Sequence, residues 1–261
     1  MNEPIRFDDG AAYERYMGKW SQLVGTPFLN WLAPEPGLRW LDVGCGNGAF
    51  TELFVTQCAP ALVRGIDPSE PQLAYARSRP ALRGAQFLPD DAMALSFPDD
   101  TFDIAVMPLV IFFVPQPARG VAEMARVVSP GGMVAAYAWD MEGGGFPYDL
   151  LRSEMTALGL EVSTPPSPDA SRMDALANLW AGAGLDAIET QQITVNRMFT
   201  DFEDYWNTIR GGPRMGARLA ALAPDRLARL RDRMQEHLSK DASGRITCGA
   251  QANAVKGRVP I

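Results

Sequence analysis

Three glycines at alternate positions, Gly44, Gly46 and Gly48, follow directly on the apolar run of residues 39–43. Glycine is needed where the backbone turns with a positive φ, or where a ligand lies so close to the main chain that a Cβ would collide. We expect residues 39–43 to form a strand, with a helix beginning at the end of the loop. Together these elements form a nucleotide-sized cradle at the carboxyl end of a parallel strand. Asp42 adds a buried acceptor that can order the loop or reach a cationic ligand.

The glycine loop by itself is compatible with more than one nucleotide. Gly44, Gly46 and Ala49 also satisfy the dinucleotide fingerprint G-x-G-x-x-A, which requires an acidic residue about twenty positions later. Asp67 is such a residue, at the end of the apolar run 62–66. In either case its carboxylate would accept hydrogen bonds from both hydroxyls of an adenosine ribose.

The chain downstream of Asp67 narrows the choice of nucleotide. A strand at residues 85–88 is followed by the pair Asp91-Ala92 and a strand at residues 102–106. A helix that begins at Pro117 then leads to the glycine turn Pro130-Gly131-Gly132 and a fifth strand at residues 133–139. Strands that alternate with helices in this way form a doubly wound parallel sheet.

This ordered set resembles the class I S-adenosylmethionine-dependent methyltransferases, in particular the small-molecule branch that includes the ubiquinone- and menaquinone-biosynthesis enzymes. The resemblance covers residues 38–140 and extends to residues 176–195. It implies a Rossmann-like α/β fold, with a doubly wound, mostly parallel seven-stranded sheet, an antiparallel last strand near residues 245–255 and a helical cap. It also implies S-adenosyl-L-methionine as cofactor and a small molecule as methyl acceptor.

The resemblance assigns roles to particular residues. The glycine loop would hold the methionine half of the cofactor, and the segment after the second strand its ribose and adenine. The Asp-Ala pair would contact the adenine, the end of the fourth strand would lie beside the transferable methyl, and an N-terminal helix would cover the cofactor. In that order the candidates are Asp42, Gly44, Cys45, Gly46 and Gly48; Asp67, Pro68 and Gln72; Asp91 and Ala92; Met107 and Leu109; and Tyr16 and Trp20, with Tyr13 beside them.

Two features depart from the family pattern. Related enzymes often carry a His or another polar residue after the fourth strand, where this chain has the apolar run 109–113. A mechanism that depends on such a His is therefore not implied. Gln72 replaces the usual methionine or leucine, and its side chain can either hydrogen-bond to adenine or face solvent.

Methyl transfer from a sulfonium is an in-line displacement for which a protein supplies position and a water-poor site. We therefore expect no essential histidine, and we place the single histidine, His237, at the exposed C-terminal end of a cap helix. If the acceptor must lose a proton, the candidate bases, which the sequence does not rank, are Tyr13, Tyr16, Tyr137, Asp140 and Tyr205. Two alternatives remain open: an NAD(P)-dependent oxidoreductase and a non-catalytic S-adenosylmethionine-binding protein.

Composition excludes several other classes. A chain of 261 residues with 47% hydrophobic content can bury a full core, and no run approaches the roughly 20 apolar residues of a membrane span. The N-terminus lacks a secretory leader, so we expect a cytoplasmic protein without integral membrane association. The formal net charge of −7 disfavours a nucleic-acid substrate. Cys45, Cys58 and Cys248 fit a reduced compartment and lack metal-ligand spacing, and Cys45 is expected to be a packing residue.

The chain divides into a core and two added parts. We expect residues 35–140, 171–196 and 244–261 to form the core, residues 141–170 and 197–243 an inserted helical substrate cap, and residues 1–34 an N-terminal helical lid. In the lid, Thr26-Pro27 predicts a break between two helices. Its apolar stripe has no evident partner in the alternating core. We therefore expect it to pack outside, over the cofactor, and removal of residues 1–24 to leave a folded core.

Overall fold

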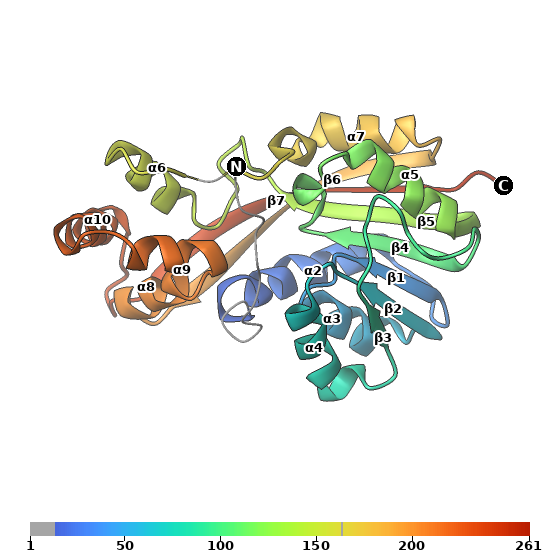
Figure 1. Ribbon diagram of the computed structural model, residues 1–261, viewed down its shortest axis with the longest axis horizontal. Coiled ribbons are helices and arrows are strands. Elements are labelled where there is room, and N and C mark those ends of the chain that lie inside the picture. Colours follow the sequence, from blue (N-terminus) through green and yellow to red (C-terminus); the bar gives the residue numbers. More distant parts are fainter. Residues whose placement is uncertain (1–13, 163) are drawn as a thin grey trace.

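The computed structural model describes residues 14–162 and 164–261. One seven-stranded sheet has the order β3-β2-β1-β4-β5-β7-β6 (Figure 1). The strands are β1 Arg39–Val43, β2 Leu62–Ile66, β3 Gln86–Leu88, β4 Phe102–Pro108, β5 Val128–Trp139, β6 Asp186–Phe199 and β7 Ile246–Arg258. Strand β7 runs antiparallel to both β5 and β6, and the other neighbouring pairs are parallel. The predicted fold is confirmed, and the last strand is longer than expected.

Helices cover both faces of the sheet, with α5 and α7 on one side and α2, α3 and α4 on the other (Figure 1). Within the described ranges, no helix is both long and apolar enough to cross a membrane. The helical segments are η1 Glu14–Gly18, α2 Lys19–Leu32, α3 Ala49–Cys58, α4 Glu70–Ser78, η2 Pro80–Leu82, η3 Ile111–Phe113, α5 Pro117–Val127, α6 Asp149–Ala157, η4 Pro168–Ser171, α7 Met173–Gly182, α8 Phe202–Arg210, α9 Pro213–Ala220 and α10 Pro224–His237.

The strand order reverses at β1, which pairs with β2 on one side and β4 on the other. Asp42 is opposite Gly65 in β2 and Val106 in β4. The loops that follow β1, β2 and β4 therefore meet at one edge of the sheet. Ligands of open α/β sheets bind at such a switch point, outside the carboxyl ends of the strands.

The N-terminal segment does not contain the predicted break. A π-helical turn, η1, leads directly into α2, and Pro27 lies inside that helix. The Thr26 hydroxyl donates back to the Gln22 carbonyl at 3.3 Å, so Thr26 does not act as an N-cap. Tertiary packing explains why the helix continues past a residue that lacks an N–H, because Trp20 and Phe28 are completely buried on one side of it.

The expectation that this helix lacks a partner in the core is also wrong. The buried face of α2 belongs to the main hydrophobic core, and Phe28 packs edge-on against Tyr137 of β5 with ring centroids 4.8 Å apart. The Ser21 and Tyr137 hydroxyls lie 3.1 Å apart, which ties α2 to the sheet. Residues 1–13, including Tyr13, lie outside the described residues.

Strands β6 and β7 extend from the core and carry helices α8, α9 and α10 at their far end (Figure 1). Their pairing is continuous from Glu189↔Lys256 to Phe199↔Ile246. The expected boundary between core and cap, at residues 196 and 197, therefore falls inside a strand. Helix α6 of the first inserted segment is joined to α10 of the second by Glu154, which pairs with both Arg233 and His237.

Candidate functional site

The glycine loop after β1 adopts a backbone geometry that favours glycine. The φ angle is 74° at Gly44, 52° at Gly46 and 79° at Gly48, all in the left-handed region. A Cβ added at Gly44 would lie 2.5 Å from the side chain of Val110. Conformation and space therefore both require glycine at Gly44, which confirms the structural part of the sequence prediction.

Main-chain hydrogen bonds fasten this loop to the end of β2. The N–H groups of Gly44 and Cys45 both donate to the Ile66 carbonyl, at 2.8 and 2.9 Å. Burial raises the pKa of the Cys45 thiol well above its ordinary value, so Cys45 stays protonated. This agrees with a packing role rather than a nucleophilic one.

Asp42 lies completely buried near the end of β1, and its two carboxylate oxygens differ in their surroundings. The Thr51 hydroxyl of α3 donates to Oδ2 at 2.7 Å, whereas Oδ1 has no hydrogen-bond partner among the described residues. Burial raises the pKa of Asp42 to about 7, against the Thr51 hydrogen bond, and the nearby Asp67 carboxylate adds to the rise. Such a group is stabilised in its charged form by a neighbouring cation.

Asp67 holds the other side of the loop. Its Oδ2 accepts from the Gly46 N–H at 3.0 Å, and its Oδ1 accepts from the Ser69 N–H at 2.8 Å. Burial raises the pKa of Asp67, and the two backbone hydrogen bonds oppose that rise. The sequence interpretation gave Asp67 a ribose-binding role, and the structure adds a second role as anchor of the loop. Each carboxylate oxygen can still accept a further hydrogen bond.

Sequence reasoning missed two residues that brace the loop. The Glu14 carboxylate accepts from the Asn47 side-chain amide at 2.8 Å and pairs with Arg79. Arg79 also donates to the Asn47 carbonyl at 2.6 Å and pairs with Glu52. These contacts join segments far apart in the chain, so no local motif could have indicated them.

Strand β4 ends in an apolar turn that lies against the glycine loop. Leu109 has a φ of 60°, and its N–H donates to the Tyr137 carbonyl at 2.7 Å. The next side chain, Val110, packs on Gly44, and Met107 is completely buried in the strand. A left-handed conformation at a non-glycine residue costs about 1–3 kcal/mol, and such strain clusters at functional sites.

The residues predicted around adenine follow β2 and β3 at the same edge. Gln72 is buried in the first turn of α4, so the alternative in which it faces solvent is wrong. Pro68 is exposed and Ala92 is half-buried. The Asp91 carboxylate is exposed and accepts from the Met93 N–H at 2.9 Å.

Tyr16 and Trp20, which were expected over the cofactor, contact residues on the cap side. Tyr16 stacks on Tyr148 with ring centroids 4.6 Å apart, and Trp20 Nε1 donates to the Tyr148 hydroxyl at 3.1 Å. Trp20 also meets Trp139 edge to face at 6.1 Å. Contact of these two rings with the cofactor stays a prediction.

His237 lies in the cap, as expected, at the C-terminal end of α10. Its side chain is 48% exposed, and its Nδ1 lies 2.6 Å from Glu154 Oε1. Arg233 holds the other Glu154 oxygen and is the main reason why the pKa of Glu154 is lowered. His237 thus helps to join α6 to α10.

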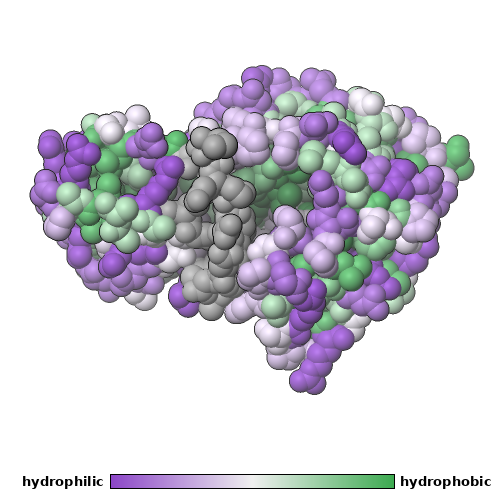
Figure 2. All heavy atoms as spheres, viewed as in Figure 1, coloured by the Kyte–Doolittle hydropathy of each residue, from purple (hydrophilic) through white to green (hydrophobic). Residues whose placement is uncertain are grey.

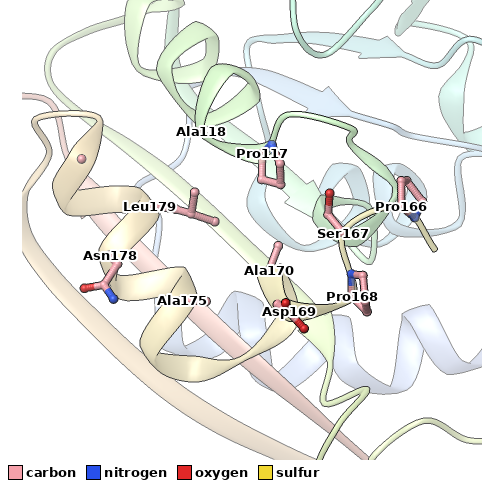
Figure 3. A pocket seen from close by; sticks show the side chains of 11 residues that line it. Pro117, Ala118, Pro166, Ser167, Pro168, Asp169, Ala170, Ala175, Asn178 and Leu179 are labelled. Carbon is pink, nitrogen blue, oxygen red and sulfur yellow. The ribbon is translucent and has the colours of Figure 1, made fainter. Parts of the chain in front are cut away.

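A pocket of about 610 Å³ opens between α5, η4 and α7 (Figure 3). Proline, alanine and leucine side chains form much of its wall, with Ser167, Asp169 and Asn178 as the polar members. None of the predicted site residues lines it, so it is distinct from the site around the glycine loop.

Comparison with known families identifies the part of the chain that carries the site. Residues 41–136 match the family model described as "Methyltransferase domain". Residues 41–136 of this chain are thus similar in sequence to a methyltransferase domain. The methyltransferase domain runs from β1 into β5, so it includes the glycine loop, Asp67 and the end of β4.

Two curated relatives share this methyltransferase domain. Phosphatidylethanolamine N-methyltransferase of Cereibacter sphaeroides is 41% identical over 102 residues, which cover 38% of this chain and 49% of that protein. Ubiquinone/menaquinone biosynthesis C-methyltransferase UbiE of a Ruegeria species is 34% identical over 108 residues, which cover 40% and 43%. The chain therefore spans less than half the length of these relatives.

Solved structures extend the similarity to nearly the whole fold. Phosphoethanolamine N-methyltransferase 2 of Haemonchus contortus, solved in complex with S-adenosyl-L-methionine, aligns with a TM-score of 0.59 over 96% of this chain and 56% of that chain. At 17% identity the likeness concerns the fold alone. The resemblance to class I methyltransferases that the sequence motifs indicated is thus confirmed.

Proposed function

We propose that this protein is an S-adenosyl-L-methionine-dependent methyltransferase that acts on a small-molecule acceptor. The observation that carries the proposal is the unpartnered, buried Oδ1 of Asp42 at the start of a loop of positive-φ glycines. S-adenosylmethionine is cationic at its amino group and at its sulfonium, so a buried carboxylate stabilises it. The pyrophosphate of a nicotinamide dinucleotide is anionic, and the same carboxylate would repel it.

The residues present fit this cofactor. The glycine loop would hold the methionine half against its main chain, because no Cβ intervenes. Asp67 would accept the ribose hydroxyls with the lone pairs that Gly46 and Ser69 leave unused. Gln72 and Asp91-Ala92 would border the adenine. When bound, the cofactor supplies the methyl group and its own leaving group.

The chain's own contribution to the reaction is position and exclusion of water. Met107, Leu109 and Val110 present an apolar floor beside the glycine loop. Correct alignment of two reactants can lower a barrier by about 7–11 kcal/mol without a catalytic side chain. This fits an enzyme whose only histidine lies in the cap.

The surroundings of three candidate bases, Tyr205, Tyr137 and Asp140, support a choice among them for an acceptor that must lose a proton. Burial raises the pKa of Tyr205 far above its ordinary value, so that hydroxyl keeps its proton. The Tyr137 hydroxyl lies within 3.2 Å of the Ser21 carbonyl and is engaged in packing α2. Asp140 follows β5 directly and is only partly buried. We therefore propose Asp140 as the base where one is needed.

The curated relatives support a small-molecule acceptor, because their names specify phosphatidylethanolamine and ubiquinone or menaquinone biosynthesis. The net charge of −7 also disfavours nucleic acid. A non-catalytic S-adenosylmethionine-binding protein would have the same loop and floor. Release of S-adenosylhomocysteine in the presence of an acceptor distinguishes it from the enzyme.

Calorimetric titration with S-adenosylhomocysteine and with NAD tests the cofactor assignment. We expect saturable binding of S-adenosylhomocysteine and none of NAD. Tight NAD binding without a response to S-adenosylhomocysteine would overturn the proposal and favour the oxidoreductase alternative.

The Asp67→Asn variant should bind S-adenosylhomocysteine at least tenfold more weakly, as measured by the same titration. Hydrogen bonds to a charged group contribute about 1.5–3 kcal/mol each, and about 1.4 kcal/mol corresponds to a tenfold change in affinity. Because Asp67 also anchors Gly46 and Ser69, we expect the variant to lose stability as well. Asp99→Asn is the matched control, because Asp99 is 71% exposed and pairs only with Arg126 among the described residues. Wild-type affinity in Asp67→Asn would refute the ribose assignment.

A further inference from the structure

Arg197 occupies a position in β6 that the strand pattern reserves for apolar side chains. From Ile193 to Phe199, alternate residues face inward and are buried, and the residues between them are exposed. Arg197 is 7% exposed, whereas its neighbour Met198 is 59% exposed. The strand thus buries a charged residue and exposes an apolar one, although Val195 and Phe199 fix its register. Such local violations of patterning are expected at functional sites.

The environment of Arg197 is aromatic, and the nearest carboxylate influence among the described residues is that of Asp204, which opposes the effect of burial on its pKa without forming an ion pair. Its guanidinium carbon lies 4.5 Å from the ring centroid of Phe199 and 5.8 Å from that of Trp20. Its only hydrogen bond within the described part of the chain runs from Nη1 to the Tyr16 carbonyl, at 3.4 Å. No described carboxylate forms an ion pair with it, and burial lowers its pKa. A buried charge is costly unless it is paired.

Other arginines of the chain show how unusual this is. Arg231 also lies over a phenylalanine ring, that of Phe202, but it pairs with Glu203. Arg79, which is mostly buried, pairs with both Glu14 and Glu52. Arg197 therefore has donors that the described part of the chain leaves unused.

A second donor without an acceptor lies in the same aromatic cluster. Trp139 ends β5, and its Nε1 is buried with no hydrogen-bond partner among the described residues. Its ring meets Trp20 edge to face, and Trp20 in turn lies under the Arg197 guanidinium. Unused donors on Arg197 and on Trp139, both counted among the described residues, indicate recognition of an anion.

This cluster adjoins the proposed methyl-transfer site. The η1 turn connects the two places, because Glu14 binds Asn47 of the glycine loop and the Tyr16 carbonyl accepts from Arg197. Trp139 stands two residues beyond Tyr137, whose carbonyl accepts from Leu109 at the end of β4. Figure 2 shows apolar residues in a hollow near the middle of the molecule, on the side of the sheet.

We propose that Arg197 binds the carboxylate of the methyl acceptor, and that the acceptor carries this group on an aromatic body. The planar guanidinium matches a carboxylate in a bidentate geometry. The rings of Tyr16, Trp20, Tyr148 and Phe199 supply a wall that suits an aromatic body. This inference rests on the proposed methyltransferase function and specifies the substrate class of that site.

Saturation-transfer NMR with matched probes tests the inference, on protein with and without S-adenosylhomocysteine. The probes are benzoate and 4-hydroxybenzoate, their primary amides, and phenyl phosphate. We expect the acids to bind and the amides to bind at least tenfold more weakly. Arg197→Met should abolish this preference, Arg197→Lys should restore part of it, and Arg231→Met, the matched control, should leave it unchanged.

Each other outcome overturns a defined part of the inference or of the proposed function. If no acid binds, if acids and amides bind alike, or if folded Arg197→Met keeps the preference, Arg197 is a structural residue and the inference is wrong. If Arg197→Met does not fold, Arg197→Lys decides, because a purely structural cation would leave the acid preference of that variant unchanged. A preference for phenyl phosphate over both acids overturns the carboxylate assignment. If S-adenosylhomocysteine does not bind, the proposed methyltransferase function is wrong. If the protein without S-adenosylhomocysteine still prefers the acids to the amides in that case, the anion site at Arg197 remains supported.

Discussion

Replacing Trp20 with alanine is expected to lower the free energy of unfolding by about 3–5 kcal/mol, the range for large aromatic residues in a core. Trp20 is completely buried, donates to the Tyr148 hydroxyl and packs edge to face on both Tyr148 and Trp139. Its loss leaves a cavity where α2, β5 and the start of the cap meet, and it removes one of the two hydrogen bonds of the Tyr148 hydroxyl, which still donates to the Tyr16 carbonyl. Urea unfolding followed by circular dichroism measures the change.

Leu23→Ala is the matched control, because Leu23 lies in the same helix but is 38% exposed. We expect it to cost less than about 1 kcal/mol. For the same reason, removal of residues 1–24 should unfold the protein rather than leave the folded core that the sequence predicted. If Trp20→Ala lowers the free energy of unfolding as little as Leu23→Ala does, α2 is not part of the core. The same conclusion follows if the truncated chain unfolds cooperatively at the urea midpoint of the wild type.

The second large effect concerns Asp42 and pH. An unfolded aspartate has a pKa of 3.8, whereas burial raises that of Asp42 to about 7. Between these values the folded protein holds a proton that the unfolded chain has released, so Asp42 makes stability fall as pH rises, by up to about 4 kcal/mol. Asp42→Asn cannot ionise and keeps an acceptor for Thr51. We therefore expect it to be more stable than the wild type above pH 7, and to lack the decline, in unfolding curves measured from pH 4.5 to 8.

The same carboxylate should make cofactor binding pH-dependent in the opposite sense. If its charged form holds the cofactor's ammonium, affinity for S-adenosylhomocysteine should rise by up to about tenfold per pH unit below pH 7 and then level off. Asp42→Asn should bind weakly, with this dependence abolished.

Asp103→Asn is the control for both measurements. Arg39 lowers the pKa of Asp103, so this carboxyl is ionised in both states throughout the window and its removal should not alter the slope. If Asp42→Asn and the wild type show parallel stability curves from pH 4.5 to 8, the Asp42 carboxyl is not held protonated in the folded state.

The parts of the molecule that sequence predicted well are those whose geometry is set by neighbouring residues. The alternate glycines predicted a tight loop between a strand and a helix. The positive φ angles at Gly44, Gly46 and Gly48 are those that such a loop requires. The strands of the core were likewise marked by short apolar runs. The number of strands and the antiparallel direction of the last one followed from the family resemblance rather than from the residues themselves.

The errors arose where distant packing decides the structure. Thr26-Pro27 is a local signal for a helix start, but burial of the face around Trp20 and Phe28 outweighs it. The roles of Glu14 and Arg79 depend on contacts across 33 and 65 positions of sequence. The sequence also held a signal at Arg197 that was overlooked. Val195 and Phe199 lie on the inward face of the strand, and the alternation places the cationic Arg197 on that same face.

The ladder between β6 and β7 runs without a break from the core into the cap, as far as Phe199 and Ile246. A domain hinge needs a few residues that are free to change their backbone angles, and a paired strand offers none. The cap is therefore attached to the core by a continuous strand pair rather than by a hinge. The length of these strands sets the distance between the cap and the glycine loop. Lengthening both strands by the same even number of residues, which preserves the inward faces, would move the cap outward and enlarge the space for an acceptor without altering the loop.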